Sequence, residues 1–208
     1  MEANTEPIVY MERVLHEEDL VAQKGLLTLP PEIRQQIYEL VVVKSRNTIT
    51  MLSNAHCFQS EVGATQPALS FVNHQLRREA LDVFYANNLF LAEISLREDL
   101  ESARRWLYAI GEQNVACLRR LALCGWTRLP FGHMTRRQWV RVVLDLKEAD
   151  IKFDEGESYA EQHPQLIRMV DELKSSFQGL VRSRKGESFD AGSLWWFMEA
   201  FHLSCVAY

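Results

Sequence analysis

Apolar residues recur every three or four positions over several long stretches of this 208-residue chain, the spacing of one face of an α-helix. The stretches predicted as helices are residues 31–44, 67–88, 98–111, 135–148, 160–183 and 192–208. Shorter segments that alternate or are rich in β-branched and apolar residues are predicted as strands: 47–52, 89–94, 115–124 and 151–153. Long helices combined with a few short strands predict an α+β fold.

The first predicted helix carries an apolar stripe whose partner the sequence leaves open. The helix begins at residues 30–32 (PPE), because proline suits a first helical turn and a carboxylate suits the positive end of the helix dipole. The stripe consists of Leu29, Ile33, Ile37 and Val41, and the polar residues Arg34, Gln35, Gln36 and Glu39 occupy the other side. Residues 37–43 (IYELVVV) are apolar nearly all round. The stripe therefore either packs in the core or leaves an exposed apolar surface, which usually marks a partner site.

Two of the predicted strands, 47–52 and 89–94, are expected to be able to pair with each other. The turn-rich segment 45–66 between the first two helices predicts a small β-hairpin. The helical part around it is expected to pack on a continuation of alternating helices and strands.

The last predicted helix contains two adjacent tryptophans, Trp195 and Trp196, followed by Phe197 and Phe201. Neighbouring side chains on a helix point about 100° apart, so both indoles cannot face the same core surface. Either one of them is exposed and anchors a partner, since tryptophan is enriched at binding hot spots, or the whole helix is sandwiched inside the fold.

The expected organisation is an arm at residues 1–24, an N-terminal part at 25–95, and an α/β part at 96–208 that packs with it as one unit. The first twenty residues are polar and acidic and lack the apolar core of a secretory signal. No apolar run approaches the roughly 18 residues that span a bilayer. We therefore expect no membrane association and a location inside the cell, in the cytoplasm or the nucleus.

The charge of this chain argues against nucleic acid as a partner. The net charge is −5, whereas nucleic-acid binders usually carry a surplus of lysine and arginine. Local arginine pairs such as Arg104-Arg105 and Arg136-Arg137 sit among acidic or apolar residues and are interpreted as solvated helix faces.

The sequence predicts no catalytic residue, no metal site and no cofactor. The four cysteines form no CxxC pair, and no P-loop, nucleophile elbow, dinucleotide-binding glycine pattern or zinc-protease motif is present. A contact between Cys57 and His74, or a cation site at the acidic residues Asp150, Asp154, Glu155 and Glu157, would favour a small enzyme of unrecognised type. A buried free cysteine and a solvated acidic loop explain the same residues.

Two segments together resemble an F-box-like domain family found in many fungal proteins. Residues 27–38 (LTLPPEIRQQIY) resemble the family's opening, LLxLPPEIRxxIY. Residues 67–90 (PALSFVNHQLRREALDVFYANNLF) resemble its second pattern, PALLxVCRQIRxEALxxFYxxNxF, with Asn73-His74 where the family has Cys-Arg. The resemblance covers about a third of the chain.

This resemblance implies a protein partner. F-boxes pack their Leu-Pro opening and following helices against the Skp-type adaptor of cullin–RING ubiquitin ligases. The residues expected at the partner are Leu29, Pro30, Pro31, Ile33, Ile37 and Tyr38, with Trp195 and Trp196 as a second candidate surface. The favoured function is a non-catalytic substrate receptor. The alternative is an interaction scaffold without a ligase connection, in which residues 45–66, which ordinary F-boxes lack, fold back over that face.

Overall fold

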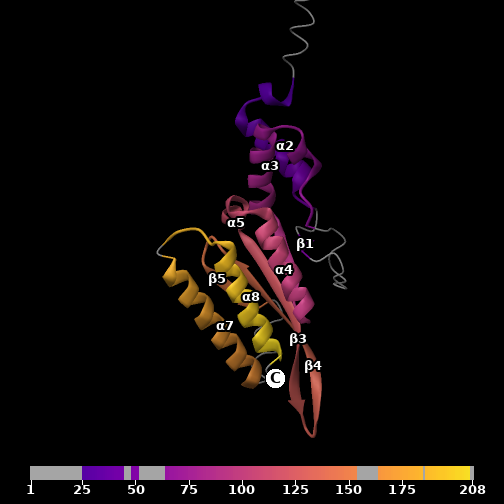
Figure 1. Ribbon diagram of the computed structural model, residues 1–208, viewed down its shortest axis with the longest axis vertical. Helices are drawn as coiled ribbons and strands as arrows, with labels where there is room; N and C mark the ends of the chain where they lie inside the picture. Colours follow the sequence, from indigo (N-terminus) through magenta and orange to yellow (C-terminus); the bar gives the residue numbers. More distant parts are fainter. Residues whose placement is uncertain (1–24, 45–47, 52–63, 154–163, 185, 207–208) are drawn as a thin grey trace, which may run out of the picture.

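The computed structural model describes residues 25–44, 48–51, 64–153, 164–184 and 186–206 (Figure 1). In that part of the chain, six α-helices and a five-stranded mixed sheet confirm the α+β class. The helices are α2 (Pro31–Val42), α3 (His74–Asn87), α4 (Arg97–Ile110), α5 (Glu112–Cys117), α7 (Pro164–Ser183) and α8 (Ala191–Val206), with short 3-10 helices at Leu26–Thr28 and Ala68–Phe71. The predicted arm, 1–24, and most of the predicted hairpin, 45–66, lie outside the described residues.

The sheet has its strands in the order in which they occur along the chain. They are β1 (Thr48–Thr50), β2 (Leu89–Glu93), β3 (Arg120–Phe131), β4 (Met134–Asp145) and β5 (Asp150–Phe153). The first three are parallel and the last three antiparallel. The predicted pairing of the first two strands is confirmed, with Ile49 opposite Phe90. Because that pair is parallel, the chain needs a crossover between them, which contains α3.

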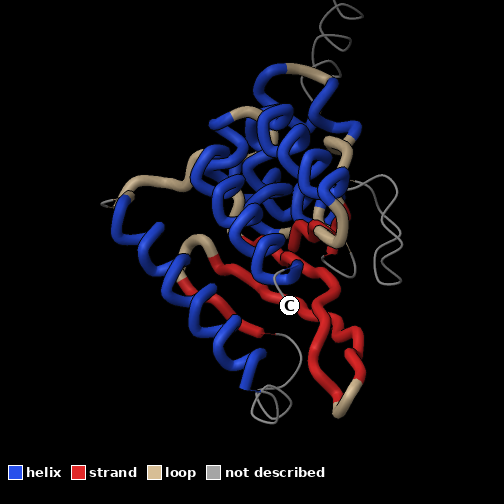
Figure 2. The backbone as a smooth tube through the Cα atoms, turned by 60° about the horizontal axis from the view of Figure 1, so that its bottom comes forward, coloured by secondary structure: helices blue, strands red, loops and turns tan. Residues whose placement is uncertain are grey.

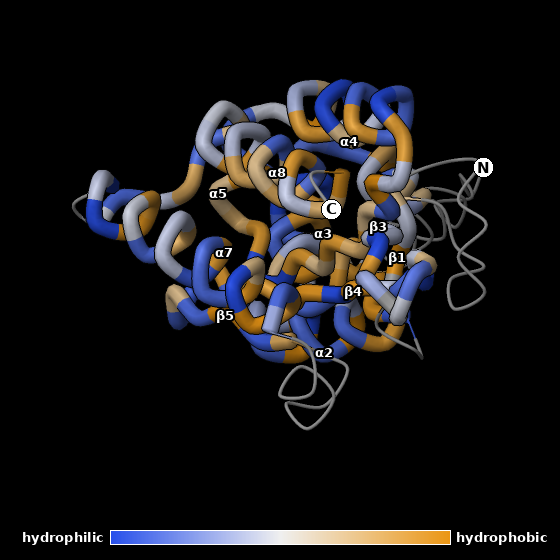
Figure 3. The backbone as a smooth tube through the Cα atoms, turned by 90° about the horizontal axis from the view of Figure 1, so that it is seen from below, coloured by the Kyte–Doolittle hydropathy of each residue, from blue (hydrophilic) through white to orange (hydrophobic). Residues whose placement is uncertain are grey.

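Three helices cover one face of the sheet. Figure 1 shows α4, α8 and α7 side by side over the strands, and the view from below in Figure 3 places α8 between the other two. Phe197 and Phe201 of α8 and Phe177 of α7 are fully buried there. Enclosure on several sides explains why α8 is apolar around most of its circumference. The N-terminal helices α2 and α3 pack on each other at one end of the molecule.

The helix predicted for residues 135–148 is wrong, because this segment is strand β4. Trp139, Val142, Val143 and Leu146 match a helical period, but the reason is that this strand is buried on one face of the sheet and partly buried on the other. Val142 and Leu144 face the helices, whereas Val143 and Trp139 pack against a small cluster of Leu91, Ala122 and Cys124 on the other face. A strand covered on both faces is apolar at consecutive positions, so its alternation of apolar and polar residues is lost.

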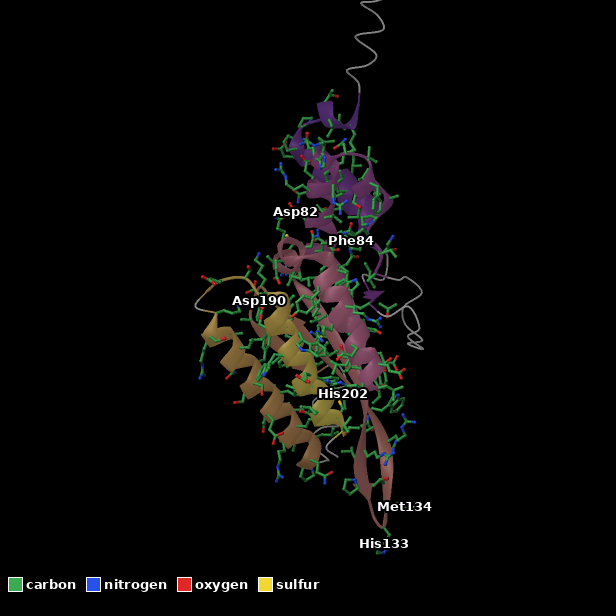
Figure 4. All side chains as sticks on the ribbon, in the orientation of Figure 1. Asp82, Phe84, His133, Met134, Asp190 and His202 are labelled. Atoms are coloured by element: carbon green, nitrogen blue, oxygen red, sulfur yellow. The ribbon has the colours of Figure 1, made fainter. Side chains whose placement is uncertain are left out.

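Strands β3 and β4 extend beyond the rest of the sheet as a two-stranded ribbon. β2 pairs with β3 only up to Cys124, and β5 pairs with β4 only from Val142 onward. The strands are joined by a two-residue turn in which Gly132 has φ +59°, a conformation that favours glycine. The ribbon projects past the helices (Figure 2), and His133 and Met134 lie at its tip (Figure 4).

Candidate functional site

Helix α2 is oriented with its predicted apolar stripe outward. Tyr38 and Val42 are 2% and 0% exposed and pack toward α3, whereas Ile33 is 42% and Val41 55% exposed. Of the four polar residues on the other side of the stripe, Arg34 is buried, whereas Gln35, Gln36 and Glu39 are exposed. At about 100° per residue, the buried positions 34, 38 and 42 form one line and the stripe at 33, 37 and 41 forms the next.

The buried side of α2 is held by a carboxylate on α3. Arg34 donates two hydrogen bonds to Glu79, from Nε to Oε2 and from Nη2 to Oε1, both at 2.9 Å. Tyr38 Oη donates a third to Glu79 Oε2 at 2.7 Å, and Gln75 Nε2 a fourth to Oε1 at 2.9 Å. The remaining Arg34 nitrogen, Nη1, donates to the Leu29 carbonyl at 2.7 Å, which ties the chain before the helix to the same cluster.

The charge of Glu79 is stabilised by these donors. Hydrogen bonds from Arg34, then from Gln75, lower the pKa of the Glu79 carboxyl from 4.5 to about 2. Burial raises the pKa of the Tyr38 hydroxyl, so this group remains a donor at neutral pH. Tyr38 is thus an internal residue that orients α2, and its ring does not lie on the exposed face.

A second set of polar contacts, made by Asn88, joins the C-terminal ends of the same two helices. Asn88, which follows α3, is fully buried. Its Nδ2 donates to the carbonyls of Val42 at 3.1 Å and Phe84 at 2.8 Å, and its Oδ1 accepts from the Lys44 N–H at 3.0 Å. Asn88 thus provides hydrogen-bond partners for backbone groups at the C-terminal end of α2, which the helix itself leaves unpaired.

The outward side of α2 presents an apolar surface, which we call the α2 face: Leu29, Ile33, Leu40 and Val41. Leu40 is 85% exposed, the most of the four. Pro30 and Pro31 are exposed at its edge, and Ile37 is half-buried between the two sides of the helix. Of the six N-terminal residues predicted at a partner, Tyr38 alone points away from this surface.

The tryptophans of α8 divide as their spacing predicts. Trp195 is half-buried, packs against the core and has the guanidinium of Arg104 5.4 Å from its ring centroid. Trp196 is 51% exposed. The helix around them is largely enclosed, so α8 is sandwiched, and one indole nevertheless reaches the surface. These residues lie on a different element from the α2 face, and the structure does not bring the two groups together.

The described residues contain no group of three or more His, Cys, Asp or Glu side chains that would hold a metal ion. Cys57 and the acidic residues 154, 155 and 157 lie outside the described part of the chain. Burial raises the pKa of the Cys205 thiol to about 12, and burial together with Asp82 raises that of Cys117 to about 11. Both thiols are therefore protonated at neutral pH, the less nucleophilic form.

No protein-family model, no curated protein and no solved structure matches this chain. The resemblance to F-box-like domains therefore stays a prediction that rests on the two motifs. Among the described helices, none combines the length and apolar composition needed to cross a bilayer.

Proposed function

We propose that this protein is a non-catalytic protein-interaction protein that docks a partner on its α2 face. The observation that carries the proposal is the outward direction of the apolar stripe. Ile33, Leu40 and Val41 lie at positions i, i+7 and i+8 of one helix and are exposed together. This spacing is the one by which a helix inserts an apolar face into a partner's groove, and contiguous exposed apolar surface usually marks an interaction site.

The partner that we propose is a Skp-type adaptor of a cullin–RING ubiquitin ligase, inside the cell. Support comes from the resemblance, since the exposed Leu29, Pro30 and Ile33 belong to the motif that F-boxes use for that contact. The internal Arg34–Glu79 pair adds support of a different kind. It joins the two halves of the resemblance and holds the stripe outward. The surface of residues 96–208 would then hold the target of the ligase.

A second candidate is an interaction scaffold with no ligase connection. It is favoured by the sheet, because β1 and β2 of the F-box-like part pair with β3 of the following part. The F-box-like part is thus built into a larger unit, unlike a detachable helical module.

Binding to a purified Skp-type adaptor, measured by pull-down and isothermal titration calorimetry, tests the proposal. Wild type should bind. Ile33→Asp should weaken binding about thirtyfold or more, the effect of losing a hot spot of about 2 kcal/mol. The double variant Leu29→Ala/Pro30→Ala should also bind more weakly.

Gln35→Asp is the matched control, because it adds the same charge about 200° further round the exposed part of α2. It should bind like wild type, and circular dichroism should show all variants folded. Failure of folded wild type to bind the adaptor would refute the ligase connection and leave the scaffold. Equal loss in Ile33→Asp and Gln35→Asp would refute the α2 face as the contact.

A further inference from the structure

The ribbon of β3 and β4 leaves one edge of β3 unpaired among the described residues. The last backbone hydrogen bond on that side runs from the Ile94 N–H to the Cys124 carbonyl at 2.7 Å. The chain then turns away through Ser95 and Leu96 into α4. Because backbone groups of alternate residues point to the same side of a strand, Trp126 and Arg128 direct their N–H and C=O groups toward this edge. Pro130 offers only a carbonyl there.

The ribbon concentrates positive charge in an otherwise acidic chain. Residues 126–141 contain four arginines and no Asp or Glu, although the net charge is −5. Arg128 lies directly opposite Arg137, so both side chains stand on the same face. No acidic side chain of the described residues pairs with either one. Like charges placed opposite each other across two strands repel, and an anionic ligand between them removes that repulsion.

A groove lies along this edge. A cavity of about 470 Å³ is bounded by Ser95 and Leu96, by the edge at residues 126–128, and by the end of α8 at residues 205–206. Arg137 also lines the cavity, and its guanidinium lies over the Trp126 ring, 4.9 Å from the indole centroid. Thr127 lines it and is 1% exposed, and its hydroxyl has no hydrogen-bond partner among the described residues. The buried hydroxyl of Ser95 likewise has no hydrogen-bond partner among the described residues.

We propose that this edge groove binds an extended acidic segment of a protein partner, which adds a strand beside β3. The backbone groups of Trp126 and Arg128 supply the ladder hydrogen bonds, as in other cases of β-strand addition. Side chains of an added strand alternate between the two faces of the sheet. On one face they meet Arg128 and Arg137. On the other they meet Val206, which is exposed, and the buried Cys205 at the end of α8. The segment is therefore one in which acidic and apolar residues alternate.

Charge also decides between occupants of the groove. A second copy paired edge to edge would bring two sets of Arg128 and Arg137 together, and like charges at an edge discourage such pairing. A nucleic acid would add many phosphates against a chain of net charge −5, without using the free backbone groups of β3. An acidic peptide matches both the charge and the edge.

The test measures fluorescence anisotropy of a labelled peptide of alternating glutamate and valine. Wild type should bind it, and Arg128→Glu and Arg137→Glu should each weaken binding about tenfold or more. Arg136→Glu is the matched control, because it makes the same charge change at the neighbouring position on the opposite face. It should reduce binding much less. The same peptide N-methylated along its backbone keeps the charge, lacks the donors, and should not bind.

Several results would overturn the inference: no binding of the peptide, equal binding of its N-methylated form, or an equal effect of Arg136→Glu. Tighter binding of a labelled oligothymidylate would show a nucleic-acid site. If the protein self-associates in analytical sedimentation and Arg128→Glu abolishes that association, the groove is a contact between copies of the chain.

Binding at the edge groove shares with the proposed function only the premise that the chain binds proteins. Ile33→Asp should leave peptide binding unchanged, and Arg128→Glu should leave adaptor binding unchanged, so that failure of one is distinguishable from failure of the other.

Discussion

Tyr38 of α2 and Glu79 of α3, 41 positions apart in the chain, are joined by a 2.7 Å hydrogen bond. The same carboxylate also binds Arg34 one turn earlier on α2. The helix α2 thus turns two polar side chains, Arg34 and Tyr38, inward, although its other side carries a purely apolar stripe. Since an unpaired buried arginine or hydroxyl is costly, Glu79 determines which side of α2 is internal and leaves Leu29, Ile33 and Val41 outside.

Glu79→Gln should lower the thermal midpoint at pH 7 and remove a pH dependence of stability. The pKa of Glu79 is about 2 in the fold against an ordinary 4.5. Because the carboxyl pKa is lower in the fold, the unfolded chain binds the proton more readily. The stabilisation that ionised Glu79 gives to the fold is therefore present above about pH 4.5 and is lost as the pH falls toward 2. Thermal melts of wild type and variant between pH 7 and 2 measure this. The gap between the two midpoints should narrow as the pH falls. A gap that stays constant would contradict the assignment.

Aspartate placed on the two sides of α2 should have opposite consequences. Val42→Asp buries an unpaired charge at a fully buried position and should unfold the protein or cost several kcal/mol. Ile33→Asp places the same charge on the exposed α2 face and should change the unfolding free energy by less than about 1 kcal/mol. Chemical denaturation followed by circular dichroism distinguishes them. If Ile33→Asp unfolds the chain as Val42→Asp does, the stripe is core and the proposed docking face is wrong.

The sequence predicted most elements because their signals are local. Pro31 and Glu32 start α2, and the period of three and four in α7 and α8 comes from one buried stripe or from burial all round. Which side of α2 faces the core was not predictable from local signals. Both Ile33–Ile37–Val41 and Tyr38–Val42 are apolar lines at helical spacing, and the choice between them depends on Glu79, which lies far away in sequence.

The ribbon was missed for a related reason. Read as a helix, residues 135–148 placed Arg136 and Arg137 on a solvated helical face. As a strand, the segment puts Arg137 directly opposite Arg128 and sends Arg136 to the other side. One local signal did point to the ribbon: Gly132 stands at a two-residue turn between segments rich in β-branched and aromatic residues. The positive charge at the edge groove depends on the register between β3 and β4, which cannot be predicted from composition.

Asn88→Ala should destabilise the junction of α2 and α3. The substitution removes one acceptor and one donor group and leaves the carbonyls of Val42 and Phe84 without this partner in a buried position. We expect a loss of about 1–3 kcal/mol in unfolding free energy, measured by urea denaturation. Asn87→Ala, one residue earlier, changes a side chain that is not fully buried and should cost much less. Comparable losses at the two positions would show that Asn88 acts only through helix termination.

Alanine at two glycines should change stability in opposite directions. A Cβ on Gly125 of β3 would lie 3.0 Å from the Ile94 carbonyl oxygen and 3.4 Å from Cys205 Sγ of α8. Because the oxygen belongs to the backbone, Gly125→Ala must shift β2 or α8, and such overpacking costs about 1–3 kcal/mol. Gly179 of α7 is exposed, with nothing within 4 Å of a Cβ. Gly179→Ala should stabilise the protein by about 0.5–1 kcal/mol, since glycine is unfavourable inside a helix. Urea denaturation of both variants measures the difference, and stabilisation by Gly125→Ala would show that α8 does not rest this closely on β3.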